Sequence, residues 1–523
     1  MGPSAEPDVS QPPHPHLELL DHEVEMTSTM KSVPLFTHNI EARLPNVERP
    51  AQYGLLASNI SRLGGSSSLS TSSVEQLRSR LFYNVAAPAS TFICGSQGSG
   101  KSHTLSTILE NCLISSKANQ LPHPLAGLVF HYDTFVSDTG GMPCEAAYIA
   151  SNTDVKVRVL CAPSNFLHIK RIYQHLPKVV VKELRISQSD LNTRRMLDLM
   201  AVSSIQGSGI PLYLHVVSRI LRDMRIAQQQ TNSAFDYKAF KTAISKESLT
   251  EGQLQPLQQR LETLESFMVT EQTFVGGSAS RSKVKPKEKA NTSAQGVEWD
   301  LLAGELTIVD LSCPCVTAET ACSLFNICLS LFLEREPTIG RIVALDEAHK
   351  YMKDSSDSQT LTESLLSVIR LQRHLGTRVI LSTQEPTISP KLLDLCSTVI
   401  VHRFTSPTWF ATLRRHLAGV YLVSDAEMKI SGRDMVNGTN TKKENDGLGS
   451  LSHLNIKDED LFPHIVGLEP GEALLFCPNA LIDIDAAGAS NSKPSLIHLG
   501  SSTMKVRIRK RITADGGQSI MAN

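Results

Sequence analysis

One eight-residue motif constrains this chain more than any other feature of its sequence. Residues 95–102 read Gly-Ser-Gln-Gly-Ser-Gly-Lys-Ser and match the pattern G-x-x-x-x-G-K-[ST] in full. Such glycines let backbone N–H groups point inward at phosphate oxygens, while the lysine places positive charge between the β- and γ-phosphates and the last hydroxyl can ligate Mg²⁺. The sequence therefore predicts a nucleotide-binding loop formed by Gly95, Ser96, Gln97, Gly98, Ser99, Gly100, Lys101, Ser102 and His103.

The residues flanking this loop predict a strand before it and a helix after it. Thr91-Phe-Ile-Cys94 is a short β-rich run, and apolar side chains then recur at helical spacing from Leu105 to Leu113. Strand-like runs alternate with helical patterns along much of the remaining chain. We therefore expect an α/β fold with a mainly parallel sheet covered by helices. The other predicted strands lie at 128–132, 155–160, 306–310, 342–346, 378–382, 398–401, 473–476 and 504–509.

A second motif supplies the acidic partner that a phosphate-binding loop requires. Arg341-Ile-Val-Ala-Leu places four apolar residues before Asp346-Glu347, as in a buried strand that ends in two carboxylates. In a parallel sheet that strand end lies at the same edge as the loop. We expect Asp346 to hold Mg²⁺ together with Ser102, and Glu347 to polarise an attacking water as general base.

Polar residues end two further predicted strands. Gln384 follows Ser382-Thr383, where its amide could bond the γ-phosphate or the attacking water; a helix cap or turn is the alternative. Asp133 follows the strand at 128–132, with a turn-capping role as its alternative. Both positions are predicted to open onto the nucleotide crevice because they end parallel strands.

Two arginines are candidates for a residue that acts across a subunit interface. Arg370 and Arg373 lie three apart just before Leu375-Gly376, so a helix would present both on one face. Such a pair fits a solvated surface or an arginine finger that stabilises charge on a neighbouring subunit's γ-phosphate. Arg403, which ends the predicted strand Val399-Ile-Val-His-Arg403, is a second candidate for this role.

The chain divides into segments of different texture. An N-terminal part rich in Pro and Ser predicts a poorly ordered arm, although parts of 30–56 could form strands on a later domain. Leucines and methionines at helical spacing predict a helical insertion within the α/β core, and a polar basic stretch after it predicts an exposed loop. The predicted units are an arm at 1–80, the first part of the core at 81–186, the insertion at 187–275, the basic loop at 276–299 and the second part of the core at 300–523.

Composition excludes several classes of protein. Lys plus Arg is 51 and Asp plus Glu is 52, a net charge of −1, which argues against bulk electrostatic coating of nucleic acid. The ten cysteines include no C-x₂-C pair and mostly lie in apolar stretches, so we expect reduced thiols in a cytoplasmic or nuclear protein. No apolar run is long enough to span a bilayer, and no secretory signal is evident, so no membrane partner is expected.

A basic stripe lies near the C-terminal end. Lys505, Arg507 and Arg509 alternate with apolar residues, so a strand would place all three on one face. This stripe could contact a nucleic-acid backbone, or it could be a solvated outer face of the sheet. No aromatic side chains are interleaved with it for base stacking.

Taken together, the motifs resemble the HerA–FtsK class of P-loop ATPases, and the phrase running from Leu81 into the loop resembles uncharacterised P-loop ATPases of filamentous fungi. The likeness covers roughly 86–175 and 300–480, and it depends on motif order. The matching segments are Ile93–Ser102, the strand ending at Asp133, Leu306-Thr-Ile-Val-Asp-Leu-Ser312, Asp346-Glu-Ala-His349, Arg373-His-Leu-Gly376, Ser382-Thr-Gln-Glu-Pro386 and Leu468-Glu-Pro-Gly-Glu-Ala-Leu-Leu475.

This resemblance implies a RecA-like core, Mg²⁺-dependent ATP hydrolysis at subunit interfaces and assembly into a hexameric ring. It implies a motor that moves or grips a polymer, with nucleic acid as one candidate substrate. Two alternatives remain open at this stage. One is an ATP-dependent switch or scaffold without translocation, and the other is a DEAH-type helicase, suggested by Asp346-Glu-Ala-His349.

Overall fold

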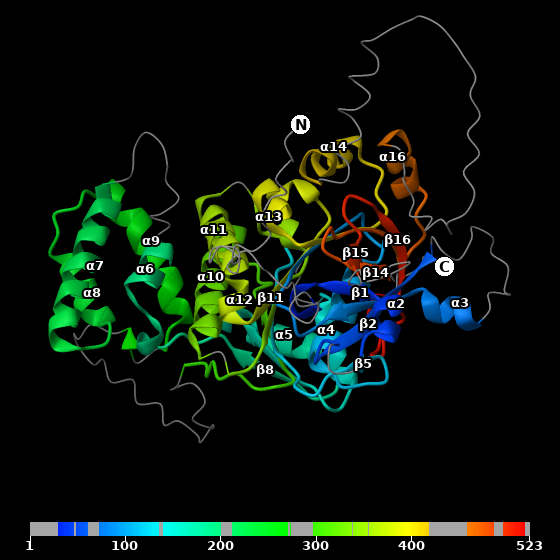
Figure 1. Cartoon of the computed structure of the whole chain (residues 1–523). Helices are drawn as coiled ribbons and strands as arrows, with labels where there is room; N and C mark the ends of the chain where they lie inside the picture. The colour runs from blue at the N-terminus through cyan, green and yellow to red at the C-terminus, as the bar shows by residue number, and fades with distance from the viewer. Residues whose placement is uncertain are drawn as a thin grey trace, which may run out of the picture.

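The computed structural model of this chain describes residues 30–45, 49–60, 73–134, 140–199, 212–269, 272–273, 296–336, 338–353, 355–417, 458–485 and 495–517. Its strands join into one 16-stranded sheet (Figure 1). The predicted α/β class with a large, mainly parallel sheet is confirmed. A single sheet within the described ranges does not favour the DEAH-type alternative, which requires a second RecA-like domain.

Eight neighbouring strands form the parallel half of the sheet, in the order β12-β4-β11-β10-β6-β9-β7-β8. Most of them are short runs of β-branched and other apolar residues that are buried on both faces, as parallel strands require. Their bounds are β4 Ser90–Cys94, β6 Ala126–His131, β7 Lys156–Cys161, β8 Val179–Glu183, β9 Glu305–Asp310, β10 Arg341–Leu345, β11 Thr377–Thr383 and β12 Thr398–Val401.

The antiparallel half of the sheet extends from β12 through β13 and is formed by segments near both ends of the chain. Within it, β1 and β14 are the one pair that runs parallel. The two-residue strand β5, Asn119–Gln120, pairs with β2 beside this path. The bounds are β1 Leu35–Thr37, β2 Tyr53–Asn59, β3 Arg80–Asn84, β13 Glu472–Phe476, β14 Leu481–Asp485, β15 Ser495–His498 and β16 Met504–Ile508.

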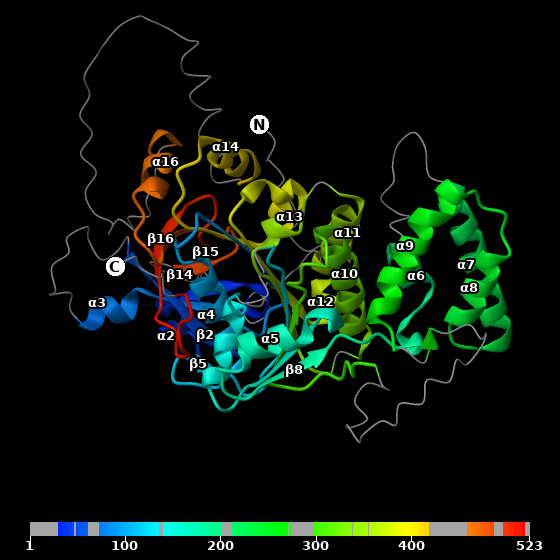
Figure 2. The same ribbon diagram turned by 180° about the vertical axis from the view of Figure 1, so that it is seen from behind.

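Helices cover both faces of the parallel half (Figures 1 and 2). On β10, Val343 belongs to one apolar core and the next residue, Ala344, to the other, as the two-residue period of a strand requires. The helices α4 Lys101–Leu113 and α5 Phe166–Tyr173, with the 3₁₀ helix η2 Glu145–Ser151, pack on the second face.

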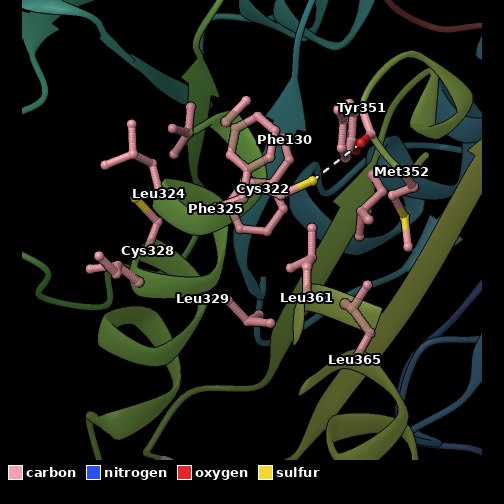
Figure 3. Close-up of a cluster of buried hydrophobic side chains, with 14 of the residues drawn as sticks. Phe130, Cys322, Leu324, Phe325, Cys328, Leu329, Tyr351, Met352, Leu361 and Leu365 are labelled. Atoms are coloured by element: carbon pink, nitrogen blue, oxygen red, sulfur yellow. Dashed lines mark hydrogen bonds between the residues drawn. The ribbon is translucent and has the colours of Figure 1, made fainter. Parts of the chain in front are cut away.

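The helices α10 Ala318–Glu334 and α11 Ser356–Arg370 pack on the first face. Thr317 caps α10 by accepting a hydrogen bond from the Thr320 N–H. Figure 3 shows how α10 meets the sheet: the Phe325 ring stacks on Phe130 of β6 at a centroid distance of 4.6 Å. In the same view the Cys322 thiol donates to the Tyr351 carbonyl at 3.2 Å. This apolar layer fixes the strands whose ends carry the predicted site.

Among its described residues, the predicted helical insertion contains four α-helices (α6 to α9). They stand to one side of the core beyond α10 and α11 in both views (Figures 1 and 2). Arg260 ties α9 to α11 through Asp357 at 3.3 Å. The predicted basic loop lies outside the described residues except at its end, where Trp299 is buried. The bounds are α6 Thr193–Leu199, α7 Leu212–Thr231, α8 Tyr237–Ser245 and α9 Glu251–Phe267.

The predicted N-terminal arm has a smaller extent than residues 1–80. Within 30–60 the chain forms β1, α2 (His38–Arg43) and β2, and α3 (Ser73–Arg78) follows. Phe36 packs against the rings of Tyr53 and Phe82, so this segment buries aromatic surface that offsets its ordering entropy. The Ser- and Gly-rich stretch at 61–72 lies outside the described residues.

Smaller helices complete the C-terminal region, and the polar segment at 418–457 lies outside the described residues. All ten cysteines are free thiols, and Cys315 is exposed. Among the described helices, none is both long and apolar enough to cross a bilayer. The remaining bounds are α12 Gln372–Leu375, α13 Pro390–Leu395, α14 Pro407–His416 and α16 Asp458–Val466.

Candidate functional site

The glycine-rich loop connects the end of β4 to the start of α4. Gly98 has φ +72° and Gly100 has φ +112°, conformations that side chains on L-residues disfavour. A Cβ on Gly100 would also lie 3.1 Å from the backbone nitrogen of Gly471. The loop is held from behind, because the Ser96 N–H and hydroxyl both donate to the Arg403 carbonyl at 2.8 Å.

Helix α4 begins at this loop with an unusually bare N-terminus. Gly100 occupies the N-cap position, no side chain caps the helix, and its first turn contains no acidic residue. The free N–H groups and the helix dipole therefore concentrate positive potential at the loop. That combination is the general physical basis of anion binding at helix N-termini.

Lys101 brings a full positive charge into the same place. Its side chain is only 4% exposed, and its ammonium donates to the Ser96 carbonyl at 3.1 Å. Burial lowers the pKa of Lys101, while the nearby carboxylates of Glu347 and Asp346 act in the opposite direction. Lys101 and the two predicted acidic residues are therefore close enough to interact, although 240-odd positions separate them in the chain.

The sheet explains this proximity. β11 lies between β4 and β10, and Leu381 of β11 pairs in register with both Phe92 of β4 and Leu345 of β10. All three strands run parallel, so Gly95, Gln384 and Asp346 follow them at one edge. The structure thus brings together the loop, Gln384 and the Asp346-Glu347 pair as the sequence predicts.

Asp346 is almost fully buried at this edge, with one carboxylate oxygen, Oδ1, that has no hydrogen-bond partner among the described residues. Burial raises the pKa of its carboxyl group, but His131, Lys350 and Lys101 outweigh burial and the net pKa is lowered. Asp346 is therefore a charged, buried carboxylate. Asp133, two residues after the end of β6, pairs with Lys350 at 3.3 Å beside this carboxylate.

Glu347 has an unfavourable backbone conformation, with φ +47° and ψ +45°. Its carboxylate accepts a hydrogen bond from the Gln384 amide at 3.1 Å. His349 accepts from the Gln384 backbone N–H at 3.3 Å, and burial, with Lys350 and Lys101, lowers the pKa of His349 to about 4. Burial and the Asp346 charge raise the pKa of Glu347. A strained carboxylate with a raised pKa at a sheet edge is typical of a functional position.

Two residues of this site escaped the sequence analysis. Glu145, at the start of η2, has a pKa raised by burial, while Arg511 and a hydrogen bond with Ser102 act to lower it. Arg511, from the C-terminal tail, places its guanidinium 2.9 Å from the Glu145 carboxylate. Neither residue belongs to a local motif, and no short pattern joins positions 366 apart. Only the tertiary contact identifies them.

His103 lies beside the same tail. Its ring bonds the Arg509 carbonyl at 2.8 Å and approaches Asp515 at 4.0 Å. The His103 side chain is therefore engaged by the tail, and its backbone belongs to the first turn of α4. The contact between His103 and the nucleotide stays a prediction, and its backbone N–H is the group placed to make it.

The structure does not bring Arg370 and Arg373 to the loop of their own chain. Both are exposed and precede β11, whereas the site follows it. At about 3.3 Å per residue, the seven residues of β11 place them roughly 20 Å from the site edge. Arg403 does lie at the loop, where its carbonyl binds Ser96 and its side chain is exposed.

The C-terminal basic stripe is paired with acidic side chains. Lys505 contacts Glu472 at 2.9 Å, Arg507 contacts Glu472 at 2.7 Å, and Arg509 contacts Glu110 at 2.7 Å. Contact of this stripe with a nucleic-acid backbone stays a prediction, and these ion pairs disfavour it because they neutralise much of the stripe's charge. The alternative, a solvated outer face of the sheet, describes the exposed Arg507. It does not describe Arg509, whose side chain is only 8% exposed.

Comparison with known proteins gives a weak structural likeness alone. No model of a known protein family matches the sequence, and no curated protein matches it. The fold is similar to that of VirB4 of Thermoanaerobacter pseudethanolicus, with 10% identity over 82% of this chain and 91% of that one and a TM-score of 0.36. It is also similar to the genome packaging NTPase B204 from Sulfolobus turreted icosahedral virus 2 in complex with ATP-gammaS. That match has 9% identity over 75% of this chain and 92% of the other, with a TM-score of 0.25. Because these TM-scores are low, the geometry of the site carries the functional proposal.

Proposed function

We propose that this chain hydrolyses ATP, with Mg²⁺, at the edge where β4, β10 and β11 end. One observation carries the proposal: the glycine loop and buried Lys101 follow β4 at the same end of the sheet at which Asp346 and Glu347 follow β10. A site for phosphate and a site for metal and water are thereby combined in one place. Neither motif alone would support a hydrolytic reaction.

The residues present fit both ligands. The uncapped N-terminus of α4 and the Lys101 ammonium supply backbone donors and positive charge for a triphosphate. The Ser102 hydroxyl and the partnerless Oδ1 of Asp346 are hard oxygen donors of the kind that Mg²⁺ prefers. Glu145, which bonds Ser102, adds a third carboxylate close to these two donors.

The proposed chemistry assigns a task to each side chain. Bound Mg²⁺ would neutralise developing charge on the phosphate oxygens. Lys101 holds the β- and γ-phosphates, and Glu347 accepts the proton of the attacking water. The Gln384 amide, 3.1 Å from Glu347, fixes that carboxylate and lies where it can also contact the γ-phosphate. Burial keeps the pKa of Glu347 raised, which strengthens it as a base relative to an exposed glutamate.

Glu347→Gln tests the base assignment. The variant should bind an ATP analogue as tightly as the wild type, because the amide keeps the size of the side chain, but should lose turnover by about 10²–10⁴-fold. Steady-state hydrolysis and calorimetric analogue binding measure the two quantities. Glu385→Gln is the matched control, since Glu385 is exposed at the same sheet edge. Normal turnover by Glu347→Gln would rule out this residue as the base.

We further propose that the ATPase acts as a ring in which Arg370 or Arg373 contacts a neighbouring chain's nucleotide. Both side chains are exposed and lie far from their own loop, as a residue acting across an interface must. A hexamer that moves a polymer such as nucleic acid is the form that the HerA–FtsK resemblance implies. Hydrolysis rates with single-stranded DNA, duplex DNA and RNA test the substrate, and nucleotide-dependent assembly without turnover would instead support the switch or scaffold.

Mixing two inactive variants tests action in trans. Arg373→Ala and Glu347→Gln chains should each be inactive alone, while mixtures should recover hydrolysis at interfaces that combine an intact Glu347 with an intact Arg373. The same mixture with Arg370→Ala assigns the role between the two arginines. Mixed assemblies that recover no activity contradict an arginine acting across the interface.

A further inference from the structure

Three side chains of metal-ligating types, His131, Cys144 and Asp346, come from separate elements and lie close together. His131 ends β6, Cys144 immediately precedes η2, and Asp346 follows β10. One ligand atom from each lies within 4.8 Å of the other two, and all three residues are buried. Cys144 is fully inaccessible, so this cluster is not a chance arrangement of surface groups.

The spacing of these atoms is close to that of a tetrahedral metal site. His131 Nδ1 lies 3.3 Å from Asp346 Oδ2, and Cys144 Sγ lies 3.8 Å from the same oxygen. With Zn–N and Zn–O bonds of about 2.1 Å and a Zn–S bond of about 2.3 Å, tetrahedral angles separate N from O by about 3.4 Å and S from O by about 3.6 Å. Shifts of a few tenths of an ångström would therefore complete the geometry.

Unsatisfied polar atoms mark the same place. Within the described residues, the buried Asp346 Oδ1 has no hydrogen-bond partner, and His131 Nδ1 makes no well-aligned hydrogen bond, its ion-pair contact being Asp346 Oδ2 at 3.3 Å. A buried nitrogen or oxygen without a partner costs free energy, and a coordinated cation removes that cost. The cluster thus has ligand chemistry, spacing and an unmet need for a partner.

We propose that His131, Cys144 and Asp346 bind a single borderline-soft divalent cation, with Zn²⁺ as the best fit. Imidazole, thiolate and carboxylate are all zinc ligands, whereas Mg²⁺ avoids sulfur. Binding forms a zinc–sulfur bond and a zinc–nitrogen bond, and it releases to solvent the Cys144 thiol proton and the Nδ1 proton of a His131 ring that is protonated in its ion pair with Asp346. Three protein ligands leave a fourth position for water.

A second layer of contacts holds Cys144 in place. The Cys144 N–H donates to the Tyr173 hydroxyl at 2.9 Å, and that hydroxyl donates to Asp310 at 2.6 Å. Contacts of this kind orient metal ligands and raise affinity for the ion. The backbone that presents the thiol is therefore fixed before any cation arrives.

Zinc at this site would compete with ATP hydrolysis, a consequence that depends on the proposed function, whereas the binding site itself does not. Asp346 belongs to both sets of ligands, so a zinc ion bound to it would neutralise the carboxylate and repel a second cation beside it. Micromolar zinc should therefore inhibit turnover at fixed Mg²⁺ and ATP, and a chelator should reverse the inhibition.

Cobalt titration of the nucleotide-free protein under reducing conditions tests the site directly. One Co²⁺ per chain should bind and give a thiolate-to-cobalt charge-transfer absorption, which is lost in Cys144→Ser and in His131→Asn. Cys161→Ser, which removes another buried thiol at the end of β7, should keep the absorption. Circular dichroism and thermal melting of each variant establish that it is folded. Absence of the absorption from the wild type, or its retention in folded Cys144→Ser, overturns the site.

The inhibition is measured as the ratio of turnover with and without zinc in each protein. That ratio should be low in the wild type and in Cys161→Ser, and should approach one in Cys144→Ser. Cobalt binding without any effect of zinc on hydrolysis overturns the competition. A protein that binds cobalt yet hydrolyses no ATP supports the metal site and refutes the proposed function. A protein that hydrolyses ATP yet binds no cobalt supports the proposed function and refutes the metal site.

Discussion

The parallel and antiparallel halves of the sheet divide the work of building this molecule. The parallel half ends in the glycine loop, Asp346, Glu347 and Gln384 at one edge. The antiparallel half carries none of these groups, but its strands come from both ends of the chain and continue directly from β12. The parallel half supplies the chemical groups. The antiparallel half packs beside the glycine loop, where the Gly471 N–H donates to the Ser99 carbonyl.

The contacts between the two halves converge on helix α4. Arg509, at the end of β16, is 2.7 Å from Glu110 of α4, and both side chains are buried. The tail beyond it continues to Arg511, whose guanidinium reaches Glu145 beside Ser102. We therefore expect changes at the site in the parallel half to alter turnover, and changes at the junction of the halves to alter stability first.

Lys101→Ala should give the largest effect. Turnover should fall by about 10²–10³-fold, as expected when one preorganised donor to a developing charge is removed. The melting temperature should stay the same or rise, because burial of the ammonium carries a desolvation cost. Steady-state hydrolysis and thermal unfolding measure the two effects.

Lys505→Ala is the control for this prediction in the antiparallel half. Lys505 is a partly exposed partner of Glu472, so its loss should change turnover by less than about two-fold. Equal losses of activity in the two lysine variants would contradict the proposed division between the halves.

Glu110→Gln should produce the largest loss of stability. Its carboxylate accepts hydrogen bonds from the Arg509 guanidinium and from the Thr513 N–H and hydroxyl. Neutralising it leaves the buried guanidinium without a counter-charge, which should cost about 3 kcal/mol of unfolding free energy. Urea denaturation measures this, while turnover per folded molecule should change by less than about ten-fold, well below the effect of Lys101→Ala.

A surface pair provides the comparison for Glu110. Glu363 and Lys391 form an exposed ion pair at 3.3 Å. Glu363→Gln should cost no more than about 0.5 kcal/mol, because exposed pairs gain little free energy in water. Similar costs for the two glutamates would show that the tail does not depend on the buried pair.

The two halves also differ in how far the sequence predicts them. β10 and β11 are apolar runs ending in Asp346-Glu347 and Gln384, and a parallel sheet brings such ends to one edge without further information. The roles of these residues in hydrolysis remain predictions. β1 and β2 lie within the predicted arm, where strands are expected only in parts of 30–56, because short strands near Pro- and Ser-rich sequence carry little periodic signal.

The partners of the site were less accessible to sequence analysis. Arg511 lies in a tail whose sequence, Ile-Thr-Ala-Asp-Gly-Gly, is typical of a loop, and its contact with Glu145 spans 366 positions. The ion pairs of the basic stripe could not be predicted for the same reason, because alternation reveals which side chains share a face but not which carboxylates lie next to them. Local sequence patterns therefore predict where strands end, but not which distant side chains form ion pairs beside those ends.

His402 should make stability depend on pH at the junction of the halves. Its Nδ1 donates to the Glu472 carbonyl at 2.9 Å, and its Nε2 lies 2.9 Å from the Thr104 hydroxyl. Burial lowers its pKa from 6.5 to about 4, so the folded state holds the neutral ring. Below pH 6.5 the unfolded chain takes up a proton that the folded chain refuses. About 2–3 kcal/mol should therefore be lost as the pH falls from 6.5 to 4.

Denaturation curves across this pH range check that contribution. His402→Gln should lower stability at neutral pH but flatten its dependence on pH between 6.5 and 4. His123→Gln, at an exposed position, should keep the wild-type slope. An unchanged slope in His402→Gln would mean that other groups account for the acid sensitivity.

The smallest expected effect concerns the strain at Glu347, within the parallel half. Glu347→Gly should be more stable than Glu347→Ala by about 1 kcal/mol, because φ +47° penalises any residue with a Cβ. Glu385, with φ −103°, provides the opposite expectation: Glu385→Gly should be less stable than Glu385→Ala by about 0.5–1 kcal/mol. Urea denaturation of the four variants measures both differences. A reversal of sign between the two positions means that the candidate base is held at a cost in stability, which the rest of the parallel half offsets. If the difference in stability between the Gly and Ala variants had the same sign at both positions, backbone strain at Glu347 would be contradicted.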